Sequence, residues 1–167
     1  MKTLPKQQPL DTNVLVALVD SHDKWHARAI ALRDALKAEE VDVVYFDPVI
    51  NEAVSVLARR SEEQKRSEQF GDLLNTLMQQ VSVQNVTWLS SETLRLYEDV
   101  LDLVRRTSGR MNFHDALIAL GCKELGIQTI VSFDKDFDEV DWLTRVDTPT
   151  AVSAVFQPPD KDKDELG

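Results

Sequence analysis

Residues 112–125, NFHDALIALGCKEL, decide the fold class, because this predicted helix is apolar almost all round from Ala116 to Cys122. Such a helix is buried on most of its sides. Three β-rich runs lie elsewhere in the chain, at Val43–Phe46, Val81–Trp88 and Thr129–Val131. Strands that alternate with helices indicate a parallel sheet covered on both faces, so we expect an α/β protein.

Apolar spacing predicts four further helices before this one. Their stripes are Trp25-Ala29-Leu32-Leu36, Val49-Ala53-Val56, Phe70-Leu73-Leu74-Leu77-Met78-Val81 and Leu94-Tyr97-Leu101-Val104. In the second of these helices, Asp47 is the expected N-cap and Pro48 suits the first helical position. A first strand is expected to end near Asp11, although the preceding sequence, Gln7-Gln8-Pro9, is poor in strand-forming residues.

Length and composition indicate a single globular domain. The chain has 167 residues, of which 43% are hydrophobic and 29% charged. We expect residues 1–150 to form this domain and residues 151–167 to form a polar, mobile tail. No apolar stretch is long enough to span a bilayer, and no secretory signal is evident, so we expect a cytoplasmic protein with no membrane partner. The single cysteine, Cys122, excludes a disulfide framework and suits a buried core position.

The formal net charge of −10 limits the possible functions. An acidic chain argues against simple electrostatic binding of nucleic acid. Either the protein does not handle nucleic acid, or some of its carboxylates are concentrated in a site that binds cations.

Four carboxylates follow or adjoin the predicted strands. Asp11 follows the first strand, Glu52 lies early in the helix after Val43–Phe46, Asp115 lies in the first turn of the apolar helix, and Asp134 follows Thr129–Val131. Ligands of open α/β sheets bind beyond the carboxyl ends of the strands, where these four residues would meet. Each taken alone also suits a turn, a helix cap or a solvated surface.

Clustered carboxylates repel one another unless cations neutralise them. Oxygen ligands suit Mg²⁺ or Mn²⁺. Two such ions suit phosphodiester cleavage, since one activates water and the other stabilises the leaving oxygen. The apolar sequence after Asp115 places this carboxylate beside a buried surface, where it must be paired or bound to a metal.

Four segments resemble the PIN-domain family, and more narrowly its VapC-type ribonuclease toxins. They are DTNVLVAL at 11–18, NE at 51–52, NFHDALIAL at 112–120 and SFDKDF at 132–137. The resemblance covers the chain from about residue 10 to 147. It implies a three-layer αβα sandwich with a mainly parallel central sheet, and metal-dependent endoribonuclease activity on an RNA substrate. It also implies a cognate antitoxin partner and a homodimer.

The resemblance also assigns roles to residues. Asp11, Glu52, Asp115 and Asp134 would be the catalytic carboxylates that hold Mg²⁺ or Mn²⁺. Asn13 would orient Asp11, and Ser132 stands where the family often has Thr. Asp136 competes with Asp134 as the fourth acid; the family wording S/T-x-D favours Asp134, and Asp136 then supports the site.

Other residues suit competing functions. Basic residues cluster at Arg59-Arg60, at Lys65-Arg66, and at Arg105-Arg106 with Arg110. They could contact an RNA backbone beside the acidic site, with Arg110 favoured because it lies just before the Asp115 helix, or they could be solvated cations at helix ends. His22 and His26 are four residues apart, as in helical zinc sites, but no third ligand is evident beyond Asp20 or Asp23. Two alternative functions are a PIN-like protein-binding module without nuclease activity and a haloacid-dehalogenase-like phosphatase. The phosphatase would require a second acid at position 13, where this chain has Asn13.

Overall fold

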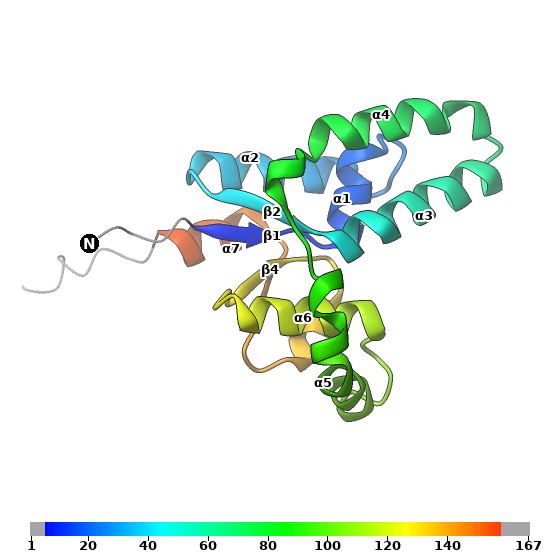
Figure 1. The fold of residues 1–167 in the computed structure, drawn as a ribbon. Helices are drawn as coiled ribbons and strands as arrows, with labels where there is room; N and C mark the ends of the chain where they lie inside the picture. Colours follow the sequence, from blue (N-terminus) through cyan, green and yellow to red (C-terminus); the bar gives the residue numbers. More distant parts are fainter. Residues whose placement is uncertain (1–5, 158–167) are drawn as a thin grey trace, which may run out of the picture.

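The computed structural model describes residues 6–157, which form parallel strands surrounded by helices (Figure 1). In chain order the elements are β1 (Gln7–Pro9), α1 (Thr12–Val19), α2 (His26–Ala38), β2 (Asp42–Phe46), α3 (Asp47–Glu63), α4 (Phe70–Gln80), β3 (Val86–Thr87), α5 (Thr93–Arg106), α6 (Phe113–Glu124), β4 (Thr129–Val131), β5 (Thr144–Val146) and α7 (Pro149–Phe156). In the view of Figure 1, α1, α2 and α4 lie above β1 and β2, and α5 and α6 lie below them. The predicted α/β fold is confirmed.

The strands run parallel in the spatial order β3-β2-β1-β4-β5. Parallel ladders join β1 to β2, β2 to β3, and β4 to β5. The two groups meet where Leu10 forms a parallel bridge with Val131, and the Asp11 amide donates to the Val131 carbonyl at 2.9 Å. β1 is therefore central, and the residue that follows it emerges in the middle of the sheet edge, where ligands bind in parallel α/β folds.

The first strand is as polar as its sequence, yet it is central and buried. Gln8 is fully buried, and its side chain accepts a hydrogen bond from the Thr129 hydroxyl at 2.7 Å and donates to the Thr129 carbonyl at 3.1 Å. A buried amide is tolerated when its polar atoms are paired in this way. The predicted position of the strand before Asp11 is confirmed, and its polarity is satisfied by β4.

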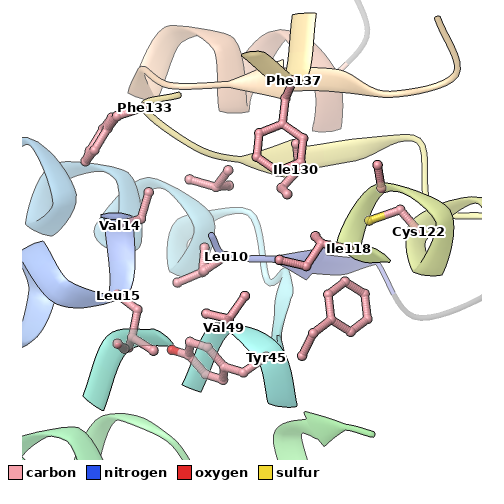
Figure 2. Close-up of a cluster of buried hydrophobic side chains, with 14 of the residues drawn as sticks. Leu10, Val14, Leu15, Tyr45, Val49, Ile118, Cys122, Ile130, Phe133 and Phe137 are labelled. Atoms are coloured by element: carbon pink, nitrogen blue, oxygen red, sulfur yellow. The ribbon is translucent and has the colours of Figure 1, made fainter. Parts of the chain in front are cut away.

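The main core surrounds the end of β1. Figure 2 shows Leu10 between Ile130 and Phe137 on one side and Val49 and Tyr45 on the other. All five side chains are buried. From α6, Ile118 and Cys122 enter the same core, as its apolar sequence predicts, and burial raises the pKa of the Cys122 thiol to about 12. Cys122 is therefore a core residue with no reactive thiolate near neutral pH.

Two local predictions were wrong. The run Val81–Trp88 is not one strand, because a 3₁₀ turn occupies Val83–Asn85 and only Val86–Thr87 pairs with β2. Asp47 does not cap α3; Phe46 is the N-cap, and Asp47 lies inside the first turn. The Asp47 carboxylate instead accepts hydrogen bonds from the Leu89 amide at 2.5 Å and from the Ser90 hydroxyl, which ties the start of α3 to the segment before α5.

The apolar stripe predicted for α5 is not the face that packs. Leu96, Val100 and Leu103 are buried, and α5 packs mainly against α6. Leu94 and Tyr97, from the predicted stripe, are 90% and 51% exposed. The apolar residues of α5 form one broad face, and the spacing selected its outer part, whereas the packing covers its inner part.

The chain's last helix corrects the predicted domain boundary. Residues 151–156 belong to α7, whose N-cap Thr148 accepts a hydrogen bond from the Ala151 amide at 3.1 Å. Val152 is fully buried, so this segment is part of the domain and not of a polar tail. The rest of the predicted tail, from residue 158, lies outside the described residues. Within residues 6–157, no helix is both long enough and apolar enough to cross a membrane.

Candidate active site

Asp11 is held by three donors at the carboxyl end of β1. Its Oδ1 accepts from the Thr12 amide at 2.7 Å, and its Oδ2 accepts from the Ser132 hydroxyl at 2.6 Å and from the Asn13 side-chain amide at 3.0 Å. The carboxylate is 4% exposed. Asn13 therefore contacts Asp11, and Ser132 contacts it from a different strand end.

Asn13 and Ser132 also fix the loop after β4. The Asn13 side-chain oxygen accepts from the Phe133 amide at 3.1 Å, and the Ser132 hydroxyl accepts from the Asp134 amide at 2.9 Å. Asp134 in turn accepts at Oδ1 from the Asp136 amide at 2.9 Å. These bonds set the position of Asp134 relative to Asp11, which lies 123 residues earlier.

Glu52 and Asp115 approach from two helices. Glu52 lies in the second turn of α3 and accepts a hydrogen bond from the Thr12 hydroxyl at 3.1 Å. Asp115 lies in the first turn of α6, where the N-cap Asn112 accepts from the Asp115 amide at 2.9 Å. This cap uses only the backbone amide of Asp115, so the Asp115 carboxylate is not engaged by it.

The structure brings the four predicted acids together. A cavity of about 220 Å³ is lined by Asp11, Thr12, Asn13, Val16, Glu52, Val56, Arg60, Asn112, Asp115 and Asp134. We call it the acidic cavity. Ser132 lies behind it, in contact with Asp11, and Asp136 is not among its lining residues.

Burial and mutual repulsion disfavour the charged forms of two of these acids. Burial is the main cause that raises the pKa of Asp11 from 3.8 to about 6, with Glu52 and Asp134 adding to it and the Ser132 and Thr12 hydrogen bonds opposing it. Burial also raises the pKa of Asp115 to about 7, followed by the charges of Asp11, Glu52 and Asp134. The carboxylates of this site therefore lack positive charges that would balance their own.

The donor set fits a divalent cation. All four acids offer oxygen atoms, which suit hard cations such as Mg²⁺ and Mn²⁺, and a bound cation would offset their repulsion. Within residues 6–157, no three acidic, histidine or cysteine side chains already stand close enough together to form a complete cage. Mg²⁺ commonly keeps several waters and binds through few carboxylates, so a complete cage is not required.

The other predicted site residues lie elsewhere. Arg110 pairs with Glu139 at 2.9 Å, and Arg105 with Asp102 at 2.5 Å; neither they nor Arg106 line the acidic cavity. His26 contacts the Ala17 carbonyl at 2.7 Å, whereas the His22 ring lies 3.1 Å from Arg66. The two histidines therefore have separate partners, and the described residues hold no zinc cluster.

Sequence reasoning included Arg60 only in a basic cluster that could contact RNA and favoured Arg110 instead, whereas the structure places Arg60 in the lining of the acidic cavity. Arg60 lies eight residues after Glu52 and four after Val56, so all three share one face of α3. This helical spacing was the available signal. Two other lining residues also lie near predicted acids in the sequence: Thr12 follows Asp11, and Asn112 lies three residues before Asp115.

The fold and the cavity define an α/β protein in which carboxylates from separate strand and helix ends line one site. The chain belongs to the PIN domain family, whose model matches residues 10–143. A search of curated protein sequences gives no match.

Two solved structures share the fold. VapC20 from Mycobacterium tuberculosis, described as a Sarcin-Ricin loop cleaving toxin, is 23% identical with a TM-score of 0.61, over 80% of this chain and 95% of that one. VapBC2 from Rickettsia felis, solved bound to a DNA fragment from its promoter, is 16% identical with a TM-score of 0.61, over 84% of this chain and 97% of that one.

Proposed function

We propose that this protein is a metal-dependent endoribonuclease that acts as the toxin of a toxin–antitoxin pair. The observation that carries the proposal is the meeting of Asp11, Glu52, Asp115 and Asp134 in one cavity of a PIN domain. The similarity of the fold to VapC20, described as a Sarcin-Ricin loop cleaving toxin, supports a cleaving toxin here. Such a toxin acts in the cytoplasm, where its RNA substrates are.

The four acids are the groups that would hold Mg²⁺ or Mn²⁺. When bound, the cation lowers the pKa of a water near the scissile phosphate and neutralises charge on the phosphate. The raised pKa values of Asp11 and Asp115 mean that both carboxylates gain their charge most readily when a cation is present.

The chain's own residues prepare this site. Asn13 and Ser132 fix one oxygen of Asp11, so the carboxylate cannot rotate away from the cavity. The Thr12 hydroxyl orients Glu52 across the cavity from β1. Rigidly held ligands lose less entropy on binding a cation and present it in a single geometry.

The direct test is cleavage of RNA by the purified protein. We expect total cellular RNA to be cleaved with Mg²⁺ or Mn²⁺ and to stay intact with EDTA. The Asp115→Asn protein, prepared in the same way, controls for contaminating ribonuclease. Equal cleavage by both proteins, or cleavage that persists in EDTA, would overturn the proposal.

Neither alternative function has a supporting observation. Asn13, where a haloacid-dehalogenase-like phosphatase needs an acid, uses its side chain to hold Asp11 and the Phe133 amide. A PIN-like module that only binds proteins would not require four acids in one cavity.

We further propose a protein antitoxin as a partner, because the resemblance to VapC-type toxins implies one and the fold matches VapBC2. Expression of the chain alone should then arrest growth, and expression of the Asp11→Asn form should not. Normal growth despite abundant active protein would contradict the toxin role but not the ribonuclease chemistry.

A homodimer is the third part of the proposal, and the outer stripe of α5 is the surface we assign to it. We define this stripe as Leu94, Tyr97 and Leu101. Glu98 and Arg105 lie on the same face, seven residues apart, which is two helical turns. In a two-fold antiparallel pairing of α5 with a second copy, Glu98 of each helix faces Arg105 of the other. The stripe is thus self-complementary in charge, as a two-fold interface requires.

Arg110 is retained as a proposed RNA contact, because it pairs at 2.9 Å with Glu139, the last residue of the 3₁₀ turn that follows Asp134. It therefore acts beside the acidic cavity without lining it.

A further inference from the structure

A second cavity adjoins the acidic cavity, and Arg60 lines both. It has a volume of about 260 Å³, and its other lining residues are Asp20, His22, Asp23, Lys24, Trp25 and Gln64. We call it the arginine-bridged cavity. Its two acids are each paired with an arginine, Asp20 with Arg66 at 2.9 Å and Asp23 with Arg60 at 2.5 Å. Its other lining residues include cationic and aromatic side chains, whereas the acidic cavity is lined by four carboxylates.

Arg60 is fixed at the boundary between the two cavities. Its Nη1 donates to Asp23 Oδ2 at 2.5 Å, and the side chain of Asp23 is only 4% exposed. Asp23 is itself held, because its other carboxylate oxygen accepts from the Trp25 amide at 2.8 Å. A guanidinium has five N–H donors, and the single bond to Asp23 leaves others available to a ligand.

The wall of the arginine-bridged cavity is continuous with the acidic site. The Trp25 ring is partly exposed and lies 4.9 Å from the ring of Phe133, measured between centroids. Phe133 precedes Asp134, and its amide is bound by Asn13, which also binds Asp11. A ligand resting on Trp25 would therefore sit at a fixed distance from the carboxylates.

Lys24 adds a second cation to this cavity. Its Nζ lies 4.5 Å from the centroid of the Trp25 ring, and the residue is exposed. An exposed lysine reorients at little cost, so it can leave the ring when a base stacks there and pair with a phosphate instead. Trp25 thus offers a surface on which a base can stack, and Lys24 offers a positive charge for a phosphate. Proteins bind single-stranded nucleic acid of any sequence through these two kinds of contact.

The negative charge of the acidic cavity explains why an RNA substrate needs cationic side chains beside it. Four carboxylates repel a phosphodiester backbone, and the chain as a whole carries a formal net charge of −10. A cation held by the four acids would offset the charge of the scissile phosphate only. The neighbouring phosphate must meet its own positive charge, and Arg60 is the guanidinium that lines the acidic cavity itself.

We propose that the arginine-bridged cavity is the subsite for the nucleotide next to the scissile phosphate of a single-stranded RNA segment. Arg60 binds the phosphate of that nucleotide, Trp25 stacks on its base, and Lys24 pairs with the following phosphate. The inference rests on the proposed ribonuclease function and names the part of the site that anchors the substrate.

The test is RNA binding in a background that does not cleave. The probe is a fluorescein-labelled, single-stranded RNA of about 20 nucleotides with randomised sequence, and binding is followed by anisotropy with Mg²⁺ at several salt concentrations. Asp115→Asn is the parent, and Arg60→Ala and Lys24→Ala are added to it separately. Arg59→Ala is the matched control, because Arg59 neighbours Arg60 on α3 but pairs with Glu63 and does not line either cavity.

We expect Arg60→Ala to weaken binding about tenfold, as loss of a charge-assisted hydrogen bond to phosphate does. The slope of log affinity against log salt should fall by about 0.7, the value of one phosphate contact on a single strand. Lys24→Ala should lower the slope similarly, and Arg59→Ala should change neither quantity. In the cleaving protein, Arg60→Ala should raise KM more than it lowers kcat.

Two results would overturn the subsite. One is equal affinity and slope for Arg60→Ala and Arg59→Ala; the other is an Asp115→Asn parent that binds no RNA. If wild type still cleaves RNA in a metal-dependent way, only the subsite is wrong, whereas loss of that cleavage removes the proposed function as well. Since Arg60→Ala leaves Asp23 unpaired and can destabilise the fold, Lys24→Ala decides the matter if Arg60→Ala does not fold. An unchanged slope in Lys24→Ala would then reject the proposal.

Discussion

The Ser132 hydroxyl donates a 2.6 Å hydrogen bond to Asp11 Oδ2, although the two residues are 121 positions apart. The same hydroxyl accepts from the Asp134 amide at 2.9 Å. One oxygen atom therefore sets the relative positions of two acids of the site. It also ties the end of β1 to the end of β4, the point at which the two groups of strands meet.

Ser132→Ala tests this relationship. We expect metal-dependent cleavage to fall between about 10-fold and 100-fold, the usual effect of removing a group that positions a metal ligand. The free energy of unfolding should fall by about 1 kcal/mol, because a buried hydrogen bond is lost. Ser132→Thr keeps the hydroxyl and should retain most of the activity. Equal loss in both variants, measured by cleavage rate and urea unfolding, would show that the hydroxyl is not what matters.

Removing one carboxylate should abolish cleavage without unfolding the protein. Asp11→Asn, Glu52→Gln and Asp115→Asn each remove a charge that would hold the dication, so the water that it activates is misplaced. Cleavage rates and circular dichroism of the purified proteins provide the measurement. Asp102→Asn, on the exposed side of α5, is the control for loss of an acid outside the cavity. Near wild-type cleavage by Asp115→Asn would contradict the assignment of the site.

Asp134→Asn should lose more activity than Asp136→Asn. Asp134 lines the acidic cavity, whereas Asp136 contacts it through its backbone amide, which both variants retain. Mg²⁺ should raise the melting temperature of Asp136→Asn as it does that of wild type, by mass action, and should raise that of Asp134→Asn less. The opposite order in both cleavage and melting would identify Asp136 as the fourth acid.

Without metal, the protein should lose stability as pH rises from about 4 to about 7. The pKa values of Asp11 and Asp115 are about 6 and about 7 in the folded chain, against 3.8 as the ordinary value. In that range the folded state binds more protons than the unfolded state, so the free energy of unfolding falls with rising pH. The combined effect is on the order of a few kcal/mol, because each pKa unit corresponds to about 1.4 kcal/mol.

Melting curves in EDTA at several pH values measure this dependence. Asp115→Asn removes one of the two groups, so its stability should fall less between about pH 5 and pH 7 than that of wild type. Comparing the two proteins cancels the titration of carboxylates elsewhere in the chain. A steeper fall in Asp115→Asn than in wild type would contradict the raised pKa.

Disruption of the outer stripe of α5 should produce monomers. Leu94 is 90% exposed, so Leu94→Glu should leave the fold intact and place a buried charge in the proposed interface. Light scattering after gel filtration should give twice the chain mass for wild type and the chain mass for Leu94→Glu. Met78→Glu is the matched control, since Met78 is an exposed apolar residue on α4. A monomeric wild type, or dimers in both variants, would reject the stripe as the interface.

The sequence by itself determined the fold class and the four acids. The apolar run of α6 requires burial on nearly all sides, and strands that alternate with helices can then form only a covered parallel sheet. Asp11, Asp115 and Asp134 lie just beyond strands or at a helix start, so the carboxyl edge of such a sheet collects them. These properties follow from local pattern and chain direction, both of which the sequence contains.

Tertiary structure decided what depends on partners distant in the chain. Gln7-Gln8-Pro9 is a poor strand by composition, yet β1 is central because Thr129 of β4 satisfies Gln8. The buried part of α5 was selected by contact with α6, since the apolar face of α5 is broad and spacing cannot say which part of it packs. Arg60 lines the acidic cavity because of the position of α3. Arg110 pairs with Glu139 because the 3₁₀ turn of Lys135–Glu139 lies beside it. The role of a charged side chain depends on the charges it meets in space, which local sequence does not specify.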